Sequence, residues 1–308
     1  MRRSFIGCGT ALVTPFLSDG SLDEAGVRRL TRRQVDLGIH FLVPCGTTGE
    51  SPTLTEDERV RIVELVVAEA GGRVRVLAGA GGYNTREVIH VAKRMREAGA
   101  SGILSVTPYY NKPTPEGLFQ HYSAIAAEVG LPIIVYNVPG RTGCNVDVAT
   151  LVRLSGIDGV IGVKEASGNV SQMCEVCRAV PESFIVLSGD DALTLPLMAV
   201  GGHGIISVAS NEVPAEMSQM VELAERNDFA AARKLHHDLL PLMAVNFIES
   251  NPIPVKSAMA AMGLLEEHYR LPMVPPREPS RQKIREVINA FQNRSKSAGA
   301  ASRASVTA

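Results

Sequence analysis

The stretch GVIGVKEASGN, residues 159–169, decides the fold of the chain. Its first five residues are all small or apolar, without the polar alternation of a strand that faces water on one side. Such a run is typical of a strand buried on both faces, as in a parallel sheet covered by helices. Lys164 ends the run, where a charged ammonium is costly unless it is paired, neutralised or used in chemistry.

Seven further runs of this kind predict seven more strands. They are FIGCGTALV from Phe5, FLVPC from Phe41, VRVLAGA from Val74, GILSVT from Gly102, PIIVYN from Pro132, FIVLSG from Phe184 and GIISVA from Gly204. Polar segments with helical periodicity lie between the strands, including residues 22–38, 55–71, 85–100 and 114–130. Eight buried strands that alternate with helices predict an α/β fold, a closed (β/α)8 TIM barrel.

The pattern changes after the eighth strand. From Pro214 to about Ala290 we expect one helix after another, the first of which completes the barrel. The predicted boundaries are 1–225 for the barrel and 226–294 for a C-terminal helical extension. Residues 295–308 are rich in Ser and Ala and have no apolar face, which favours a disordered tail.

Composition and charge restrict the class of partner. The chain has 308 residues, of which 45% are hydrophobic, so it can bury a large core. Its 31 basic and 32 acidic residues give a formal net charge of -1 without long runs of one sign. This balance argues against nucleic acid or a membrane surface and favours a small solute. No apolar run reaches membrane-spanning length and no convincing leader is visible, so we expect a cytoplasmic protein.

No cofactor and no metal site is expected from the motifs. Cys174 and Cys177 form a CxxC within a predicted helix, but no second pair completes a zinc set. The five cysteines are expected to be reduced, and the seven histidines are scattered and expected to be structural or exposed. The glycines of residues 79–82 lack the spacing of a dinucleotide fingerprint, and no P-loop motif occurs.

The candidate site lies where the carboxyl ends of the strands meet, because the loops that carry the chemistry of a barrel gather there. Lys164 is the sharpest candidate. An amine removed from water is more readily used in its neutral form, which attacks a carbonyl group to form a Schiff base. The alternative is a structural lysine paired with a neighbour such as Glu165.

Two more loops bring suitable groups to the same rim. Tyr136 and Arg141 follow the fifth strand, which neighbours the sixth in a barrel. A phenol can shuttle protons, and a guanidinium can hold a carboxylate with two hydrogen bonds. Taken singly, each is as well explained by packing or by solvation, but their closeness favours a shared site. Thr47 and Thr48 lie between two glycines after the second strand and are suited to line an anion or relay a proton.

Taken together, six motifs of the chain resemble the dihydrodipicolinate synthase branch of the N-acetylneuraminate lyase family, which contains class I, Schiff-base aldolases. They are, in chain order, GTTGES, PYYNKP, YNVPGRTG, GVKEASGN, SGDD and ESNPIPVK. The resemblance runs from about Phe5 to about Gln292. It implies condensation of pyruvate with L-aspartate 4-semialdehyde in lysine and diaminopimelate biosynthesis. A sugar-acid or N-acetylneuraminate type of pyruvate aldolase is an alternative, and a non-catalytic barrel that binds a keto acid is another.

The resemblance also implies catalytic roles. Lys164 would form the imine with pyruvate. Tyr136, Thr47 and Tyr110 would form a proton relay, with Tyr110 reaching in from a neighbouring subunit. The active protein would then be at least a dimer, and the family suggests a homotetramer built as a dimer of dimers.

Four further residues would bind substrate by the same resemblance. Thr48 would hold the carboxylate of pyruvate, and Gly189 and Ile206 would line the pyruvate pocket. Arg141 would hold the carboxylate of the semialdehyde. Sialic-acid lyases and sugar-acid aldolases generally lack this arginine, so a short substrate that ends in a carboxylate fits better.

Regulation by lysine is expected to be weak or absent. Family members that lysine inhibits bind it at a subunit interface, often with a histidine where this chain has Glu56. Tyr109 and Glu87 match that interface site, but Glu56 does not.

Overall fold

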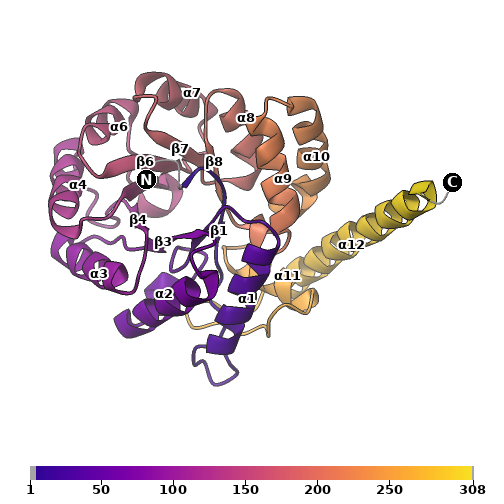
Figure 1. Cartoon of the computed structure of the whole chain (residues 1–308). Helices are drawn as coiled ribbons and strands as arrows, with labels where there is room; N and C mark the ends of the chain where they lie inside the picture. The colour runs from indigo at the N-terminus through magenta and orange to yellow at the C-terminus, as the bar shows by residue number, and fades with distance from the viewer. Residues whose placement is uncertain (1–4, 307–308) are drawn as a thin grey trace.

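Eight parallel strands close into a barrel in the order β1 to β8, as the sequence predicts. The computed structural model describes residues 5–306, with side chains as far as residue 293. Figure 1 looks along the barrel, with the helices arranged around the strands. The strands are β1 Gly7–Ala11, β2 Phe41–Val43, β3 Arg75–Gly79, β4 Gly102–Val106, β5 Ile133–Asn137, β6 Val160–Glu165, β7 Ile185–Ser188 and β8 Gly204–Ser207.

Two apolar layers hold the barrel together. The outer layer packs strands against helices and includes Val163 of β6. The inner layer fills the barrel, where Phe5 and Phe41 meet edge to face with ring centroids 5.7 Å apart. Side chains alternate along a strand, so Val163 faces the helices and Lys164 faces the interior.

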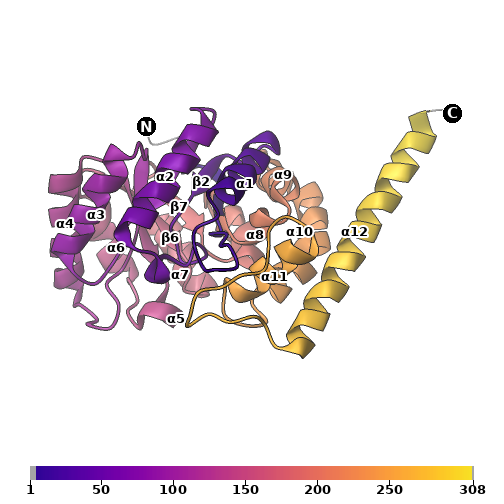
Figure 2. The same cartoon turned by 90° about the horizontal axis from the view of Figure 1, so that it is seen from below.

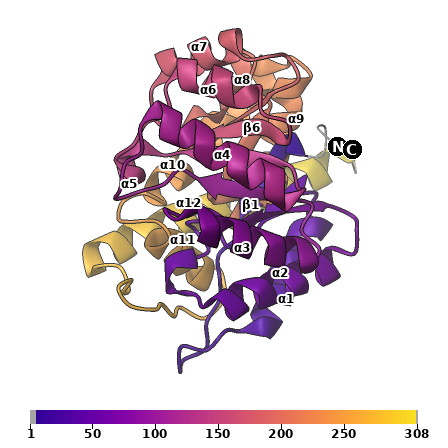
Figure 3. The ribbon, with the colours of Figure 1, turned by 90° about the vertical axis from the view of Figure 1, so that its left-hand side faces the viewer.

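The helices of the barrel begin where the sequence predicts. At the start of α2, Thr55 and Glu58 form a capping box in which each side chain binds the other residue's backbone N–H. Figure 3 shows α3, α4, α6 and α7 following one another along the outer face. The barrel helices are α1 Glu24–Asp36, α2 Glu56–Ala70, α3 Thr85–Glu97, α4 Pro115–Val129, α5 Pro139–Thr142, α6 Val148–Ser155, α7 Val170–Ala179, α8 Thr194–Ala199 and α9 Pro214–Glu225.

Three helices form the C-terminal part, α10 Phe229–Val245, α11 Ile253–Ala261 and α12 Glu278–Val306. The expected run of helices is interrupted over residues 262–277, because the prolines of LPMVPP break helical hydrogen bonding. In Figure 2, α11 and α5 lie at the same end of the barrel, and α12 projects away from it.

Helix α12 also continues to Val306, through most of the segment for which the sequence predicts a disordered tail. Its last two turns contain several alanines and no proline, and alanine has the highest intrinsic helix propensity. Of the helices that the structure describes, none combines the length and the apolar character needed to cross a membrane.

Candidate active site

Lys164 and Tyr136 lie side by side at the mouth of the barrel. They are register partners on β6 and β5, so their side chains project in the same direction. Lys164 is only 5% exposed, and its Nζ lies 4.3 Å from the centroid of the Tyr136 ring. None of the ion pairs among the described side chains includes Lys164. The amine therefore has an aromatic neighbour and no carboxylate partner.

Glu165 faces the opposite way, toward the helices. Its Oε2 accepts a hydrogen bond of 2.9 Å from Nδ2 of Asn137, and its Oε1 accepts one of 2.7 Å from the backbone N–H of Ser167. Glu165 thus ties β5 to the loop after β6. The alternative of a structural Lys164–Glu165 ion pair is wrong, because successive residues of a strand point to opposite faces.

Gly189 lies against the lysine, and Ile206 lies in the inner apolar layer of the barrel. A β-carbon added to Gly189 would lie 2.5 Å from Cβ of Ala166 and 3.0 Å from Cε of Lys164. Only glycine therefore fits beside the lysine without displacing a neighbour. Ile206 of β8 is fully buried in the inner layer that also contains Tyr136.

A cavity of about 260 Å³ opens at this rim. Thr47, Tyr136 and Arg141 line it, and they come from the loop after β2, from β5 and from α5. The cavity is small compared with pockets for drug-sized ligands, which suits small metabolites. Arg59 and Tyr109 also line it, and sequence reasoning did not assign Arg59 to the site.

Thr48 is buried beside the cavity and is bound by the C-terminal part of the chain. Nδ2 of Asn251 donates a 2.9 Å hydrogen bond to Oγ1 of Thr48. The backbone carbonyl of Asn251 accepts a hydrogen bond of 3.3 Å from Nη2 of Arg141. Sequence reasoning included Asn251 in the motif ESNPIPVK but gave it no role, since nothing local indicates its distant partners.

Tyr110 lies outside the cavity of its own chain. Its side chain is 93% exposed, and its backbone has a φ of 69° in the left-handed region. The neighbouring Tyr109 packs edge to face with Tyr83, with ring centroids 5.2 Å apart. Within one chain Tyr136 therefore adjoins Lys164 and lines the same cavity as Thr47, and Tyr110 lies at the surface.

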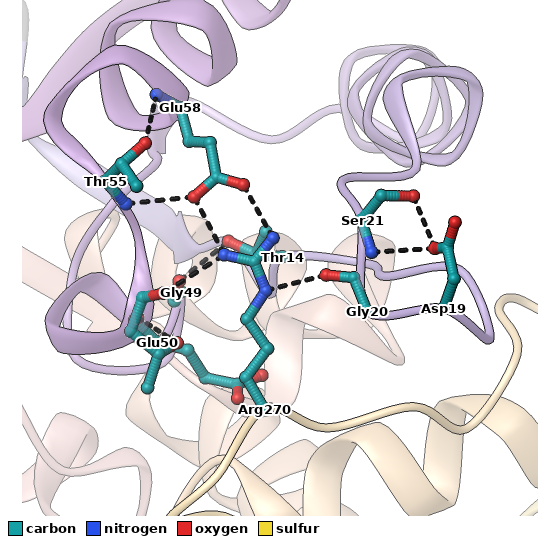
Figure 4. A network of polar contacts seen from close by, with 10 residues as sticks. Thr14, Asp19, Gly20, Ser21, Gly49, Glu50, Thr55, Glu58 and Arg270 are labelled. Carbon is teal, nitrogen blue, oxygen red and sulfur yellow. Dashed lines mark hydrogen bonds and ion pairs between the residues drawn. The ribbon is translucent and has the colours of Figure 1, made fainter.

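A polar network holds the loop after β2 that carries Thr47 and Thr48, here called the threonine loop (Figure 4). Oγ1 of Thr14 donates to the carbonyl of Gly49 at 2.7 Å. Arg270 forms two hydrogen bonds with Glu58, of 2.8 and 2.6 Å, and a third with the carbonyl of Gly20. The bonds from Arg270 lower the pKa of Glu58 to about 2. One arginine of the C-terminal part thus joins the loop after β1 to the start of α2.

A second lysine, Lys256, is completely buried under the same loop. Its Nζ lies 2.6 Å from Oε1 of Glu50 and 4.5 Å from the centroid of the Phe16 ring. Burial lowers the pKa of Lys256, and the Glu50 carboxylate opposes that shift. Glu50 has a φ of 54°, which non-glycine residues seldom adopt, so the ion pair holds a strained turn. Lys256 thus has a buried carboxylate partner, whereas Lys164 has none among the ion pairs of the described side chains.

Other reactive groups near the rim are poorly suited to chemistry. Cys45 lines the cavity, but burial raises the pKa of its thiol to about 12, which disfavours the nucleophilic thiolate at neutral pH. Among the residues that the structure describes, no three His, Cys, Asp or Glu side chains gather closely enough to hold a metal ion.

Comparison with known proteins identifies the family of the chain. The model of the dihydrodipicolinate synthetase family matches residues 4–291. The chain belongs to this family. The match covers the range over which the sequence resembles the dihydrodipicolinate synthase branch, so that resemblance is confirmed.

Curated and solved relatives of this family member are similar over nearly the whole chain. The 4-hydroxy-tetrahydrodipicolinate synthase of Koribacter versatilis is 55% identical over 282 residues, which cover 91% of this chain and 94% of that protein. The dihydrodipicolinate synthase structure from Aquifex aeolicus is 43% identical, with a TM-score of 0.91 and coverage of 94% and 98%. The chloride-inhibited enzyme of Acinetobacter baumannii, solved in complex with pyruvate, is 40% identical, with a TM-score of 0.92 and coverage of 93% and 99%.

Proposed function

We infer that this family member is a 4-hydroxy-tetrahydrodipicolinate synthase, a Schiff-base-forming lyase of lysine and diaminopimelate biosynthesis. Its substrates are pyruvate and L-aspartate 4-semialdehyde. One observation carries the proposal. Lys164 is buried at the barrel mouth against Tyr136 and has no acidic partner among the described residues. A buried amine without a carboxylate partner is suited to form an imine with a keto acid.

We propose that Lys164 attacks the keto carbon of pyruvate and releases water to form the imine. Loss of a methyl proton gives the enamine, whose carbon then adds to the aldehyde carbon of the semialdehyde. The amino group of the semialdehyde then attacks the imine carbon, which closes the ring of the product and releases Lys164 as the amine. Tyr136 and Thr47, together with Tyr110 of the partner subunit, relay the protons that these steps release and take up. Such a relay explains why a phenol and a hydroxyl line the cavity beside the lysine.

Substrate binding follows from the groups around the amine. Thr48 holds the carboxylate of pyruvate, and Gly189 and Ile206 leave room for its small body. Arg141 holds the carboxylate of the semialdehyde, which a guanidinium can bind with two parallel hydrogen bonds. The exposure of Tyr110 leaves it free to reach a second chain, which supports at least a dimer. We further propose a cytoplasmic homotetramer, a dimer of dimers, by resemblance to the family.

Borohydride reduction in the presence of pyruvate tests the proposal. We expect a covalent adduct on Lys164, found by peptide mass spectrometry, and no adduct in a Lys164→Met variant. Lys256→Met is a poor control because it leaves Glu50 as an unpaired buried charge, so the partly exposed Lys93, in a Lys93→Met variant, serves instead. Turnover with the semialdehyde but not with sugar acids then separates the synthase from other pyruvate aldolases. Absence of an adduct in the wild type rejects Schiff-base chemistry altogether.

A further inference from the structure

Asn251 touches both of the residues that the proposed function assigns to substrate carboxylates. It lies just before α11 and is only 6% exposed. Its side chain binds Thr48 and its backbone carbonyl binds Arg141. A single residue of the C-terminal part therefore joins two groups that lie in separate loops of the barrel.

The direction of the hydrogen bond to Thr48 has a chemical consequence. The amide nitrogen of Asn251 can only donate, so Oγ1 of Thr48 accepts at this contact. The hydroxyl proton of Thr48 is then free to point elsewhere. A carboxylate accepts such a proton, so the amide prepares Thr48 to donate to an anionic substrate.

The surroundings hold Asn251 in place. Lys256 follows it by five residues, on α11, and forms the buried pair with Glu50 of the threonine loop. Asn251 and Thr48 are thus fixed from both sides of their contact. Oδ1 of Asn251 is buried and has no hydrogen-bond partner within the described part of the chain, so the contact with Thr48 is the one polar role seen for the side chain.

We propose that Asn251 is a positioning residue for pyruvate, whose side-chain amide directs the Thr48 hydroxyl proton toward the pyruvate carboxylate. The inference rests on the proposed function, because it needs Thr48 to bind pyruvate. It assigns to the C-terminal extension a part in substrate binding that the barrel alone does not supply.

The test measures the pyruvate concentration that gives half-maximal borohydride trapping on Lys164, without the second substrate. Asn251→Ala is expected to raise this concentration about tenfold, with a change of less than about threefold in the maximal rate of trapping. Thr48→Val is expected to have a similar effect. Combining the two is expected to add less than about twofold to the effect of Thr48→Val, because Asn251 acts through Thr48.

Asn251→Asp keeps the size of the side chain and reverses the polarity of the contact. The carboxylate would accept the Thr48 proton and repel the substrate, so we expect a larger rise than for Asn251→Ala. Asn246→Ala is the matched control, because it removes another buried amide of the C-terminal part, bound to Glu212 and not to a site residue. This control is expected to lower the melting temperature and leave the half-maximal pyruvate concentration unchanged.

Three outcomes overturn the inference while leaving the proposed function intact. They are an unchanged half-maximal concentration in Asn251→Ala, effects of Asn251→Ala and Thr48→Val that multiply, and a loss confined to the maximal rate. A wild-type protein that traps no pyruvate rejects the proposed function instead.

Discussion

In the proposed function, the choice of substrate depends on the side chain of Arg141. Its guanidinium lines the cavity with Tyr136, and its Nη2 is held by the carbonyl of Asn251. We expect Arg141→Ala to raise the KM for aspartate semialdehyde by about two orders of magnitude, because a two-pronged, charge-assisted contact is lost. Steady-state kinetics with each substrate varied in turn measure this effect.

Arg141→Lys separates charge from geometry, since it keeps the positive charge and loses the planar fork. It is expected to give an intermediate KM. Pyruvate trapping on Lys164 is expected to change by less than about twofold in both variants, because the proposed function assigns Arg141 to the other substrate. Unimpaired condensation in Arg141→Ala would instead favour a different aldolase of the family.

Glu212 makes stability depend on pH through a single buried carboxyl group. Burial raises its pKa well above the ordinary value, Asp191 adds to this rise, and Nδ2 of Asn246 donates to Oε2 at 2.7 Å. A carboxyl group with a raised folded-state pKa supports folding below its unfolded-state pKa and loses that contribution as pH rises through the folded-state pKa. Glutamine does not ionise, so Glu212→Gln removes this loss of stability at high pH.

We therefore expect the free energy of unfolding of Glu212→Gln, relative to the wild type, to increase as pH rises from about 5 to about 8. Denaturant unfolding at several pH values measures the trend. Glu182→Gln is the control, because Glu182 is exposed and the change should be independent of pH. A pH-independent difference for Glu212→Gln would show that the carboxyl group ionises normally in the folded protein.

At the scale of elements, the pair of Glu50 and Lys256 joins the loop after β2 to α11. Removing one partner leaves the other as an uncompensated buried charge, so Lys256→Met is expected to lower the free energy of unfolding by about 3–5 kcal/mol. The double variant Glu50→Gln, Lys256→Met removes both charges and is expected to recover most of that loss. Urea unfolding of the two variants measures both changes in the free energy of unfolding. A double variant no more stable than Lys256→Met would show that packing, rather than charge, causes the loss.

The face shared by α2 and α3 bears on control by lysine. Oε1 of Glu56 accepts hydrogen bonds from His90 at 2.9 Å and from Arg94 at 2.5 Å, and these bonds to Arg94 and His90 lower the pKa of Glu56. The carboxylate is therefore already bound to two side chains of α3. We expect L-lysine at about 1 mM to leave the rate within about twofold of the uninhibited value. Sub-millimolar inhibition in an activity titration would contradict this expectation.

For the whole molecule, the sequence predicts the barrel well because its strands are buried on both faces and its helices begin at recognisable caps. The chemistry of single residues was harder to predict. Lys164 and Lys256 both lie in apolar surroundings, and only the fold shows that Lys256 has an acidic partner, 206 residues away in the chain. Likewise, only the fold shows that Asn251 binds Thr48, which lies 203 residues away in the chain. Neither partnership leaves a local signal.

In the proposed function, Tyr110 is the site residue that a second chain supplies. It is exposed in its own chain, and the proposed relay needs it in the cavity of a neighbour. Two inactive variants, Lys164→Met and Tyr110→Phe, can therefore be unfolded, mixed in equal amounts and refolded together. In a mixed dimer, the Tyr110→Phe chain keeps Lys164 and receives an intact tyrosine from the Lys164→Met chain. Random pairing then restores about one quarter of the wild-type activity. If Tyr110 served its own chain, the mixture would show only the average of the two parents, since no site would contain both intact residues.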